Sequence, residues 1–302
     1  MADTTIAPAK RSNFVQGAMW MVGAVISFTV MAVSGKAVMS ELDTFELMMY
    51  RSFTGVIIVV AYVILSHRGS EITTEKLGAH VVRNLFHFSG QNLWFAAILM
   101  IPIAKVFAIE FTSPIWVLLL SPLVLGESLT RSRAMTAFAG FIGILIVTRP
   151  SFSSISLGEI LAAVAAICFA TTNLLTRRLT RTQSITAILF YLTVLQAIFG
   201  IVMSAYDGEV AVPSMGLWPY VVAVGVAGLM AHLCLTRALS LAPAAAVMPI
   251  DFARLPVIAI VGYVLYNESI DIYAMIGAMI IFGANYLNVV HEAKLTKAPP
   301  VL

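Results

Sequence analysis

The chain alternates between long apolar runs and short polar breaks along its whole length. Each run is close to the ~20 residues that a helix needs to cross the hydrocarbon core of a bilayer. The breaks hold turn-forming and polar residues, and none is long enough for a soluble domain. The ten apolar runs are residues 15–35, 45–65, 80–100, 103–125, 132–149, 157–176, 185–204, 217–236, 243–266 and 272–290. The pattern predicts an all-α integral membrane protein with ten transmembrane helices.

Composition supports a protein in the membrane. Of the 302 residues, 60% are hydrophobic and 11% are charged, whereas soluble domains carry about 25% charged residues. The net charge of +3 therefore does not indicate a nucleic-acid partner. Cys168 and Cys234 both lie inside apolar runs, which indicates buried thiols rather than a disulfide framework.

Lysine and arginine gather at alternate ends of the predicted helices. With the N-terminus in the cytoplasm, thirteen of them, Arg83 included, flank the inner ends, and only Lys36 and Arg149 flank the outer ends. Cytoplasmic loops of membrane proteins carry this excess of basic residues. The bias predicts that both termini are cytoplasmic, with residues 1–14 and 291–302 as tails.

The chain repeats itself with an ungapped shift of 141 positions, most clearly between residues 102–127 and 243–268. The shift places Glu110 on Asp251, so an acidic residue lies in each of two matching membrane segments. Thr130 and Asp271 also match and are both predicted helix N-caps. Further aligned pairs are Pro102 with Pro243, Phe111 with Phe252, Glu127 with Glu268, Lys36 with Arg177 and Tyr50 with Tyr191.

The repeat divides the chain into two five-helix units, residues 15–149 and 150–290. Because five is an odd number, the second unit must enter the membrane in the opposite sense to the first. Inverted repeats of this kind place substrate near the bilayer midplane, where the two halves meet. We therefore predict two inverted five-helix repeats around a central site.

Two motifs stand at matching places in the repeats: FTSPIWVLLLSPLVLGES at residues 111–128 and the weaker LYNES at residues 265–269. With the ten short helices in two repeats, they resemble the EamA-type permeases of the drug/metabolite transporter superfamily. The resemblance covers about residues 15–290. It implies a secondary transporter of the bacterial inner membrane, with a cavity lined by the first, third, fourth, sixth, eighth and ninth helices. The charge within the fourth and ninth helices departs from the commoner family pattern and argues against a purely apolar drug.

Glu110 and Asp251 are the first candidates for a binding site. A charge near the bilayer centre costs roughly 2.5–3.5 kcal/mol on insertion scales, so it normally faces a cavity or a partner. One interpretation is cation binding or proton coupling where the repeats meet. The other is a structural ion pair, because Arg254 lies three residues from Asp251 on the same helical face.

The third predicted helix carries a polar stripe. Its members are spaced 3, 4 and 3 residues apart, which places them on one face that lipid would reject. They are Asn84, His87, Gln91 and Trp94, with Asn92 beside them. A Trp near amide and imidazole groups suits a flat or cationic ligand. Hydrogen-bonded helix packing is the alternative.

Three further candidates lie on other predicted helices. His232 matches Gln91 under the shift, so both are expected beside one cavity, with helix packing as the alternative. Asn173 is a candidate on the sixth helix. Lys105 is expected either to snorkel to water or to contact an anion. Arg51, inside the second helix, has snorkelling and packing between the halves as its two interpretations.

These patterns favour a secondary transporter and exclude other classes. The His and Cys residues show no metal-ligand spacing, and the chain has no phosphate-binding loop, so neither a metal nor a cofactor is expected. The function expected is alternating-access transport of a small polar, zwitterionic or cationic metabolite, and the family suggests an amino acid, an S-adenosylmethionine-like compound or a vitamin. A multidrug or metabolite exporter driven by proton antiport is the alternative, and an intramembrane enzyme is a remote one. The partners expected are the solute, the lipid bilayer and a coupling proton, for a monomer or a homodimer.

Overall fold

The computed structural model describes residues 14–125, 131–148, 155–179, 181–206, 209–241, 250–251 and 253–297. Within these ranges the chain is helical and has no strand, which confirms the all-α prediction. The α-helices are α1 (Phe14–Val38), α2 (Thr44–Leu65), α3 (Leu77–Met100), α4 (Ile103–Glu110), α5 (Ser113–Leu125), α6 (Arg131–Thr148), α7 (Leu157–Leu179), α8 (Ile185–Ser204), α9 (Trp218–Leu241), α11 (Arg254–Tyr266) and α12 (Ile272–Lys297). Each of the ten predicted apolar runs overlaps at least one of them.

Several positions used in the sequence argument lie outside the described residues. They are residues 1–13 and 298–302 of the tails, residues 126–128 at the end of the first motif, Thr130, Arg149, Pro243 and Phe252.

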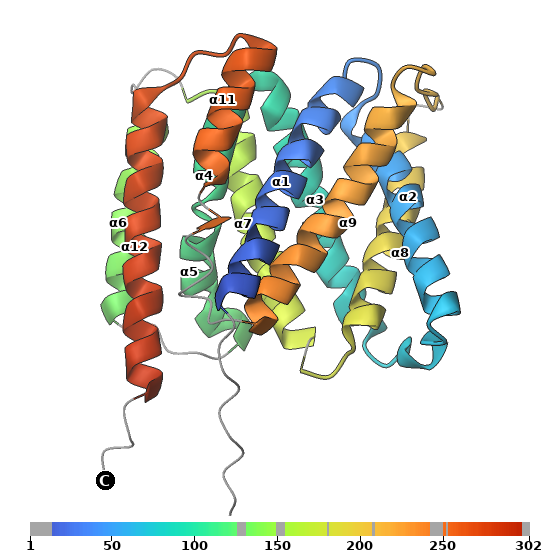
Figure 1. Ribbon diagram of the computed structural model, residues 1–302, viewed down its shortest axis with the longest axis horizontal. Helices are drawn as coiled ribbons and strands as arrows, with labels where there is room; N and C mark the ends of the chain where they lie inside the picture. The colour runs from blue at the N-terminus through green and yellow to red at the C-terminus, as the bar shows by residue number, and fades with distance from the viewer. Residues whose placement is uncertain are drawn as a thin grey trace, which may run out of the picture.

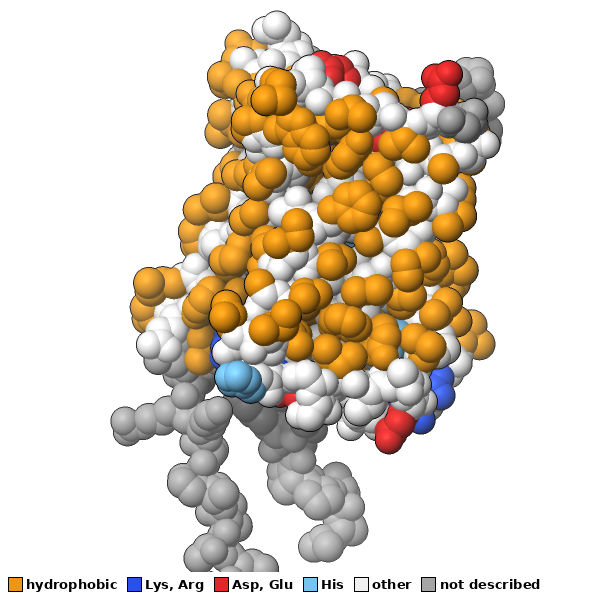
Figure 2. Space-filling model, turned by 90° about the vertical axis from the view of Figure 1, so that its right-hand side faces the viewer, with side chains coloured by type: hydrophobic (Ala, Val, Ile, Leu, Met, Phe, Trp, Pro, Cys, Tyr) orange, Lys and Arg blue, Asp and Glu red, His pale blue; other side chains and the backbone are white. Residues whose placement is uncertain are grey.

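The outer surface of the helix bundle is apolar across its middle. Figure 2 shows hydrophobic side chains over most of one face, with charged side chains gathered at its two ends. Five helices (α1, α2, α7, α8 and α9) contain segments long and apolar enough to cross a membrane. Helix α3 has a similar length, but the polar residues that it buries lower its hydropathy. This is the surface expected of a multi-pass membrane protein.

The helix bounds repeat with the same shift as the sequence. Residues 77–100 (α3) shifted by 141 become 218–241, the bounds of α9, and 113–125 (α5) become 254–266, the bounds of α11. In Figure 1, α3 runs upward and its counterpart α9 runs downward. The two halves are therefore inverted with respect to each other, as an odd number of helices requires.

The most extensive helix contacts in the described structure join one half to the other. Helix α1 packs along α9, and α3 along α7, and the shift exchanges these two pairs. Helix α2 packs on its own counterpart α8, as α6 does on α12. The halves are thus interlocked around a local two-fold axis. Helix α1 begins and α12 ends at the same end of the molecule, the lower end in Figure 1.

The predicted helix at residues 103–125 is not continuous. It breaks at Phe111–Thr112 into α4 and α5. Pro114 cannot donate a backbone N–H to the carbonyl of Glu110, four residues earlier, so the helix cannot pass through this point unbroken. Other groups at the break bond locally: Ile115 N donates to Thr112 O at 2.8 Å, and the Thr112 hydroxyl donates to Ile109 O at 2.7 Å.

The second half breaks in the same place. Helix α11 begins at Arg254, which is 141 residues after the start of α5 at Ser113. Pro114 and Pro256 each lie in the first turn of a new helix, where a missing backbone N–H breaks no helical hydrogen bond. Pro122 does lie inside α5.

Polar contacts hold the upper end of the bundle together. The Lys36 ammonium at the end of α1 forms an ion pair with Glu268, and the other carboxylate oxygen of Glu268 accepts from Ile103 N at 2.8 Å. The Tyr266 hydroxyl donates to Val33 O at 3.1 Å. At the start of α12, Asp271 accepts a hydrogen bond from Tyr273 N, which confirms its predicted N-cap role.

Helices α6 and α12 approach each other through glycine. A Cβ atom on Gly277 would lie 2.5 Å from the backbone oxygen of Gly143 and 2.5 Å from Val147 Cγ2. On the same helix α12, a Cβ atom on Gly283 would have no neighbour within 4 Å among the described residues. Close backbone approach at small residues stabilises helix pairs in lipid.

Replacing Gly277 by Ala is therefore expected to destabilise the protein by about 1–3 kcal/mol, because the methyl group meets backbone that cannot move alone. Gly283→Ala is the matched control and should leave stability unchanged or slightly raised. Thermal unfolding of the purified protein measures both. Equal unfolding temperatures for the two variants would contradict this account of the α6–α12 contact.

Candidate functional site

The two acidic candidates meet at the helix breaks, joined by one arginine. The Arg254 guanidinium lies 2.8 Å from Asp251 Oδ2 and 3.7 Å from Glu110 Oε1. Trp94 Nε1 donates to the other Glu110 oxygen at 2.8 Å. We call these four residues the acidic cluster. Three of them come from the broken helices of the two halves, and Trp94 comes from α3.

Aromatic rings surround the arginine of the acidic cluster. The Arg254 guanidinium lies 4.5 Å from the ring centre of Phe28, 5.1 Å from that of Phe111 and 5.3 Å from that of Phe107. Cation–π contacts of this kind are stronger when they are desolvated, and only 6% of the arginine side chain is exposed. The rings hold the guanidinium between the two carboxylates.

The acidic cluster carries more negative than positive charge. Two carboxylates face one guanidinium, and Asp251 Oδ1 has no hydrogen-bond partner within the described structure. A structural ion pair explains Asp251 and Arg254, as one sequence interpretation held. It leaves Glu110 with a shared, longer contact and a side chain that is 18% exposed. The cluster can therefore accept a further positive charge.

A second cluster, which we call the basic cluster, lies beside the first and contains Arg51, Gln91, His87 and His232. Arg51 Nη1 donates to Gln91 Oε1 at 2.6 Å, and the His87 and His232 rings are 5.7 Å apart. Arg51 is 8% exposed, so it does not snorkel to water. The sequence left its role open between snorkelling and packing, and the helix arrangement decides against snorkelling.

The two clusters are adjacent through α3 and α1. On α3, Gln91 contacts the basic cluster and Trp94, one turn later, contacts the acidic cluster. On α1, the Phe28 ring lies against Arg254 and also 5.9 Å from the His232 ring, edge to face. The polar stripe on α3 therefore joins groups of opposite charge.

Arg83 also differs from its predicted place. It was counted with the basic residues that flank the membrane, but it is buried in α3. Its Nε donates to Thr176 Oγ1 at 3.0 Å and its Nη1 to Asn84 Oδ1 at 2.8 Å. The charge pattern alone could not show this, because a flanking position and a buried one look alike in sequence.

The other candidates are not gathered into either cluster. Asn84 donates to Tyr191 O of α8 and to His80 O of its own helix, and Asn92 donates to Phe88 O. Lys105 forms an ion pair with Glu159 of α7, so its charge has a structural partner. Asn173 is exposed on α7. For the two asparagines of α3, the contacts favour the packing interpretation.

A model of the EamA-like transporter family matches residues 15–149 and 156–290, which is most of the chain. This protein belongs to the EamA-like transporter family. The family model thus matches the chain twice, once within each half.

Named relatives of this EamA-like protein transport different solutes. A riboflavin transporter from Brucella anthropi is 31% identical over 218 residues, covering 71% of this chain and 77% of the relative. An S-adenosylmethionine uptake transporter from Rickettsia bellii is 24% identical over 278 residues, covering 92% and 94%. A pseudopaline exporter from Pseudomonas aeruginosa is 25% identical over 269 residues, covering 89% and 94%. Their names support a metabolite transporter.

A solved crystal structure shares the fold of the EamA-like protein. Its TM-score is 0.63 at 17% sequence identity, and the match covers 94% of this chain and 99% of the other. At this identity the likeness shows the fold alone.

Removing the positive charge of the acidic cluster is expected to be costly. Arg254→Leu leaves two carboxylates without a cation and should destabilise the protein by about 3–5 kcal/mol. Adding Glu110→Gln and Asp251→Asn should restore most of that stability, because no unpaired charge remains. The measurement is thermal unfolding of the purified variants.

The control for this experiment is Arg68→Gln. Arg68 and Glu71 form an exposed pair at 3.4 Å, and exposed pairs contribute about 0–1 kcal/mol. If Arg254→Leu unfolds at the same temperature as this control, the buried ion pairs do not stabilise the helix breaks.

Proposed function

We propose that this protein is a secondary active transporter for a small polar metabolite that is zwitterionic or cationic. The observation that carries the proposal is the acidic cluster at the paired helix breaks, with net negative charge and with the basic cluster one turn away on α3. Inverted-repeat transporters bind solute between such broken helices. The carboxylates would take the positive group of the solute, and the mechanism would be rocking of one bundle against the other.

S-adenosylmethionine and related compounds are the first solutes to test. Such a molecule carries a sulfonium, an ammonium and a carboxylate, which matches clusters of both signs, and the relative from Rickettsia bellii is named as its uptake transporter. Riboflavin is the second candidate, favoured by the 31% identical relative. Riboflavin carries no charge at neutral pH, so its binding does not require the negative charge of Glu110. The two candidates therefore predict different mutant behaviour.

Glu110→Gln should lower transport of S-adenosylmethionine at least tenfold, since a charge-assisted contact is worth about 1.5–3 kcal/mol. The measurement is counterflow of labelled solute in proteoliposomes that contain equal amounts of reconstituted protein. Glu75→Gln, at an exposed position before α3, is the control and should transport normally. Wild-type rates in the Glu110 variant would remove Glu110 from the site, and no counterflow by the wild-type protein would overturn the proposal for these solutes.

A proton is the proposed coupling ion. Glu110 shares Arg254 with Asp251, so a small displacement of the arginine leaves one buried carboxylate without its cation. Such a carboxylate takes up a proton rather than stay charged in a medium of low dielectric. Counterflow needs no gradient, so comparing it with uptake and export driven by an imposed pH gradient tests coupling separately and covers both directions of movement.

We further propose that the protein lies in the bacterial inner membrane with both termini in the cytoplasm. The excess of Lys and Arg on one side supports this, together with the shared end at which α1 begins and α12 ends. A reporter that is active only in the cytoplasm should be active when it is fused to either terminus. A reporter that is active only in the periplasm should be inactive at both. A periplasmic reporter that is active at either terminus would contradict the orientation.

A further inference from the structure

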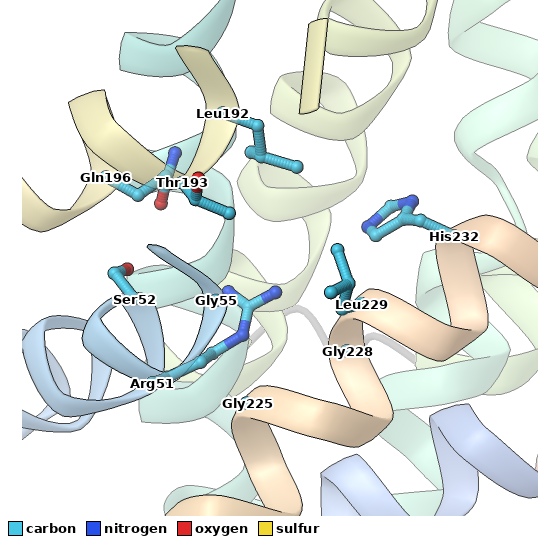
Figure 3. A pocket seen from close by; sticks show the side chains of 10 residues that line it. All are labelled: Arg51, Ser52, Gly55, Leu192, Thr193, Gln196, Gly225, Gly228, Leu229 and His232. Atoms are coloured by element: carbon cyan, nitrogen blue, oxygen red, sulfur yellow. The ribbon is translucent and has the colours of Figure 1, made fainter. Parts of the chain in front are cut away.

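A pocket in the membrane-embedded part of the structure lies between α2, α8 and α9. Figure 3 shows the Arg51 side chain from α2 and the His232 ring from α9 turned toward it. The side chains of Ser52, Thr193 and Gln196 add hydroxyl and amide groups, and none of the residues that line the pocket is acidic. The space inside, about 30 Å³, suits a water molecule or one small polar group.

The pocket lies on the local two-fold axis that relates the halves. Its lining contains three pairs of positions that are 141 residues apart: Arg51 with Leu192, Ser52 with Thr193, and Gly55 with Gln196. Equivalent positions meet only at the axis. Ser52 and Thr193 give each half a hydroxyl group at the same position. The charge differs between the halves, because Arg51 in one half faces Leu192 in the other. One half alone therefore places a positive charge at the axis.

Arg51 is buried without an opposite charge. It donates to the neutral Gln91 Oε1 at 2.6 Å and to the Met48 sulfur at 3.6 Å, and no carboxylate pairs with it among the described residues. Arg83 likewise donates to neutral oxygens, those of Thr176 and Asn84. An uncompensated guanidinium at this depth is costly, and an anion beside it would remove that cost.

The backbone of α9 leaves room for the guanidinium. A Cβ atom on Gly228 would lie 2.8 Å from Arg51 Nη2 and 3.0 Å from its Nε. The equivalent position in the first half is His87. The second half therefore has the smallest residue where the first half has a large ring, and Arg51 fills the space.

We propose that Arg51 binds an anionic oxygen group, a carboxylate or a phosphate, of the transported solute in this pocket. This inference rests on the proposed function and adds the second contact of a zwitterion: the negative group at Arg51 and the positive group at Glu110. The two contacts join α3 at Gln91 and Trp94, which differ by about 4.5 Å along the helix axis. Arg51 lies seven residues after the start of α2, about 10 Å into the helix, which is deeper than a lipid headgroup normally reaches.

Thermal unfolding of the purified full-length protein with sodium acetate or sodium phosphate tests the site directly. Sodium chloride at matched pH and ionic strength is the reference. An anion at about five times its dissociation constant should raise the unfolding temperature of the wild-type protein by about 2–4 °C. Arg51→Gln should abolish the shift, and Arg51→Lys should reduce it, because an ammonium cannot bind both oxygens in the same plane.

Two glycine variants keep the experiment decisive if Arg51→Gln does not fold. Gly228→Ala retains the charge but displaces the guanidinium, so it should weaken the anion effect. Gly78→Ala adds a methyl group in open space and should preserve it. Absence of an anion shift in the wild-type protein would overturn the site, and so would an undiminished shift in both Arg51→Gln and Gly228→Ala.

A lipid arm identifies the source of the anionic group. Phosphatidylglycerol is added to the delipidated protein in place of the free anions. One outcome is that the lipid stabilises the wild-type protein but not the Arg51→Gln variant, while acetate and phosphate stabilise neither. That result would assign the pocket to a lipid headgroup and overturn the solute site. If the wild-type protein shows counterflow but no stabilisation by anions, only this inference is rejected. If it shows stabilisation by anions but no counterflow, only the proposed transport is rejected.

Discussion

Helix α4 ends and helix α11 begins part-way along the bundle, and the charges at these two ends must be neutralised inside the protein. Glu110 ends α4, Asp251 holds the equivalent position in the second half, and Arg254 begins α11. Water cannot compensate them in the hydrocarbon region, so they compensate each other. Because the residues come from different halves, the halves must meet at this point. The position of the proposed central site follows from this electrostatic requirement.

The repeat explains the architecture, and the departures from it indicate function. The helix bounds of α3 and α5 agree with those of α9 and α11, and the breaks agree too, as expected where they only define the scaffold. The side chains near the axis differ: arginine faces leucine, and histidine corresponds to glycine. A symmetric scaffold with an asymmetric lining suits a solute that has two unlike ends. In the proposed rocking mechanism, the scaffold would move between equivalent arrangements while the solute kept one orientation.

Much of the fold could be predicted from the sequence, because hydropathy directly reflects contact with lipid. The ten helical segments, the inverted repeat and the equivalence of Glu110 with Asp251 all follow from that pattern. The contacts could not be predicted, since a helical face reveals its polarity and not its partner. That one arginine reaches both carboxylates depends on the meeting of two distant helices. The burial of Arg83 and the ion pair of Lys105 with Glu159 depend on packing in the same way. The break at Phe111 was hidden by an apolar run that continues across it.

The interlocking of the halves also has a consequence for biogenesis. The helices of the first half leave the ribosome before their main packing partners have been made. Helix α1 packs on α9, and Lys36 pairs with Glu268, which is 232 residues later in the chain. Early helices must therefore remain in the translocon or in lipid with their polar faces uncovered until the second half is inserted. During that interval the polar stripe of α3 is the part of the first half whose exposure to lipid is most costly. Assembly of this carrier is thus a late event, completed only when translation is nearly finished.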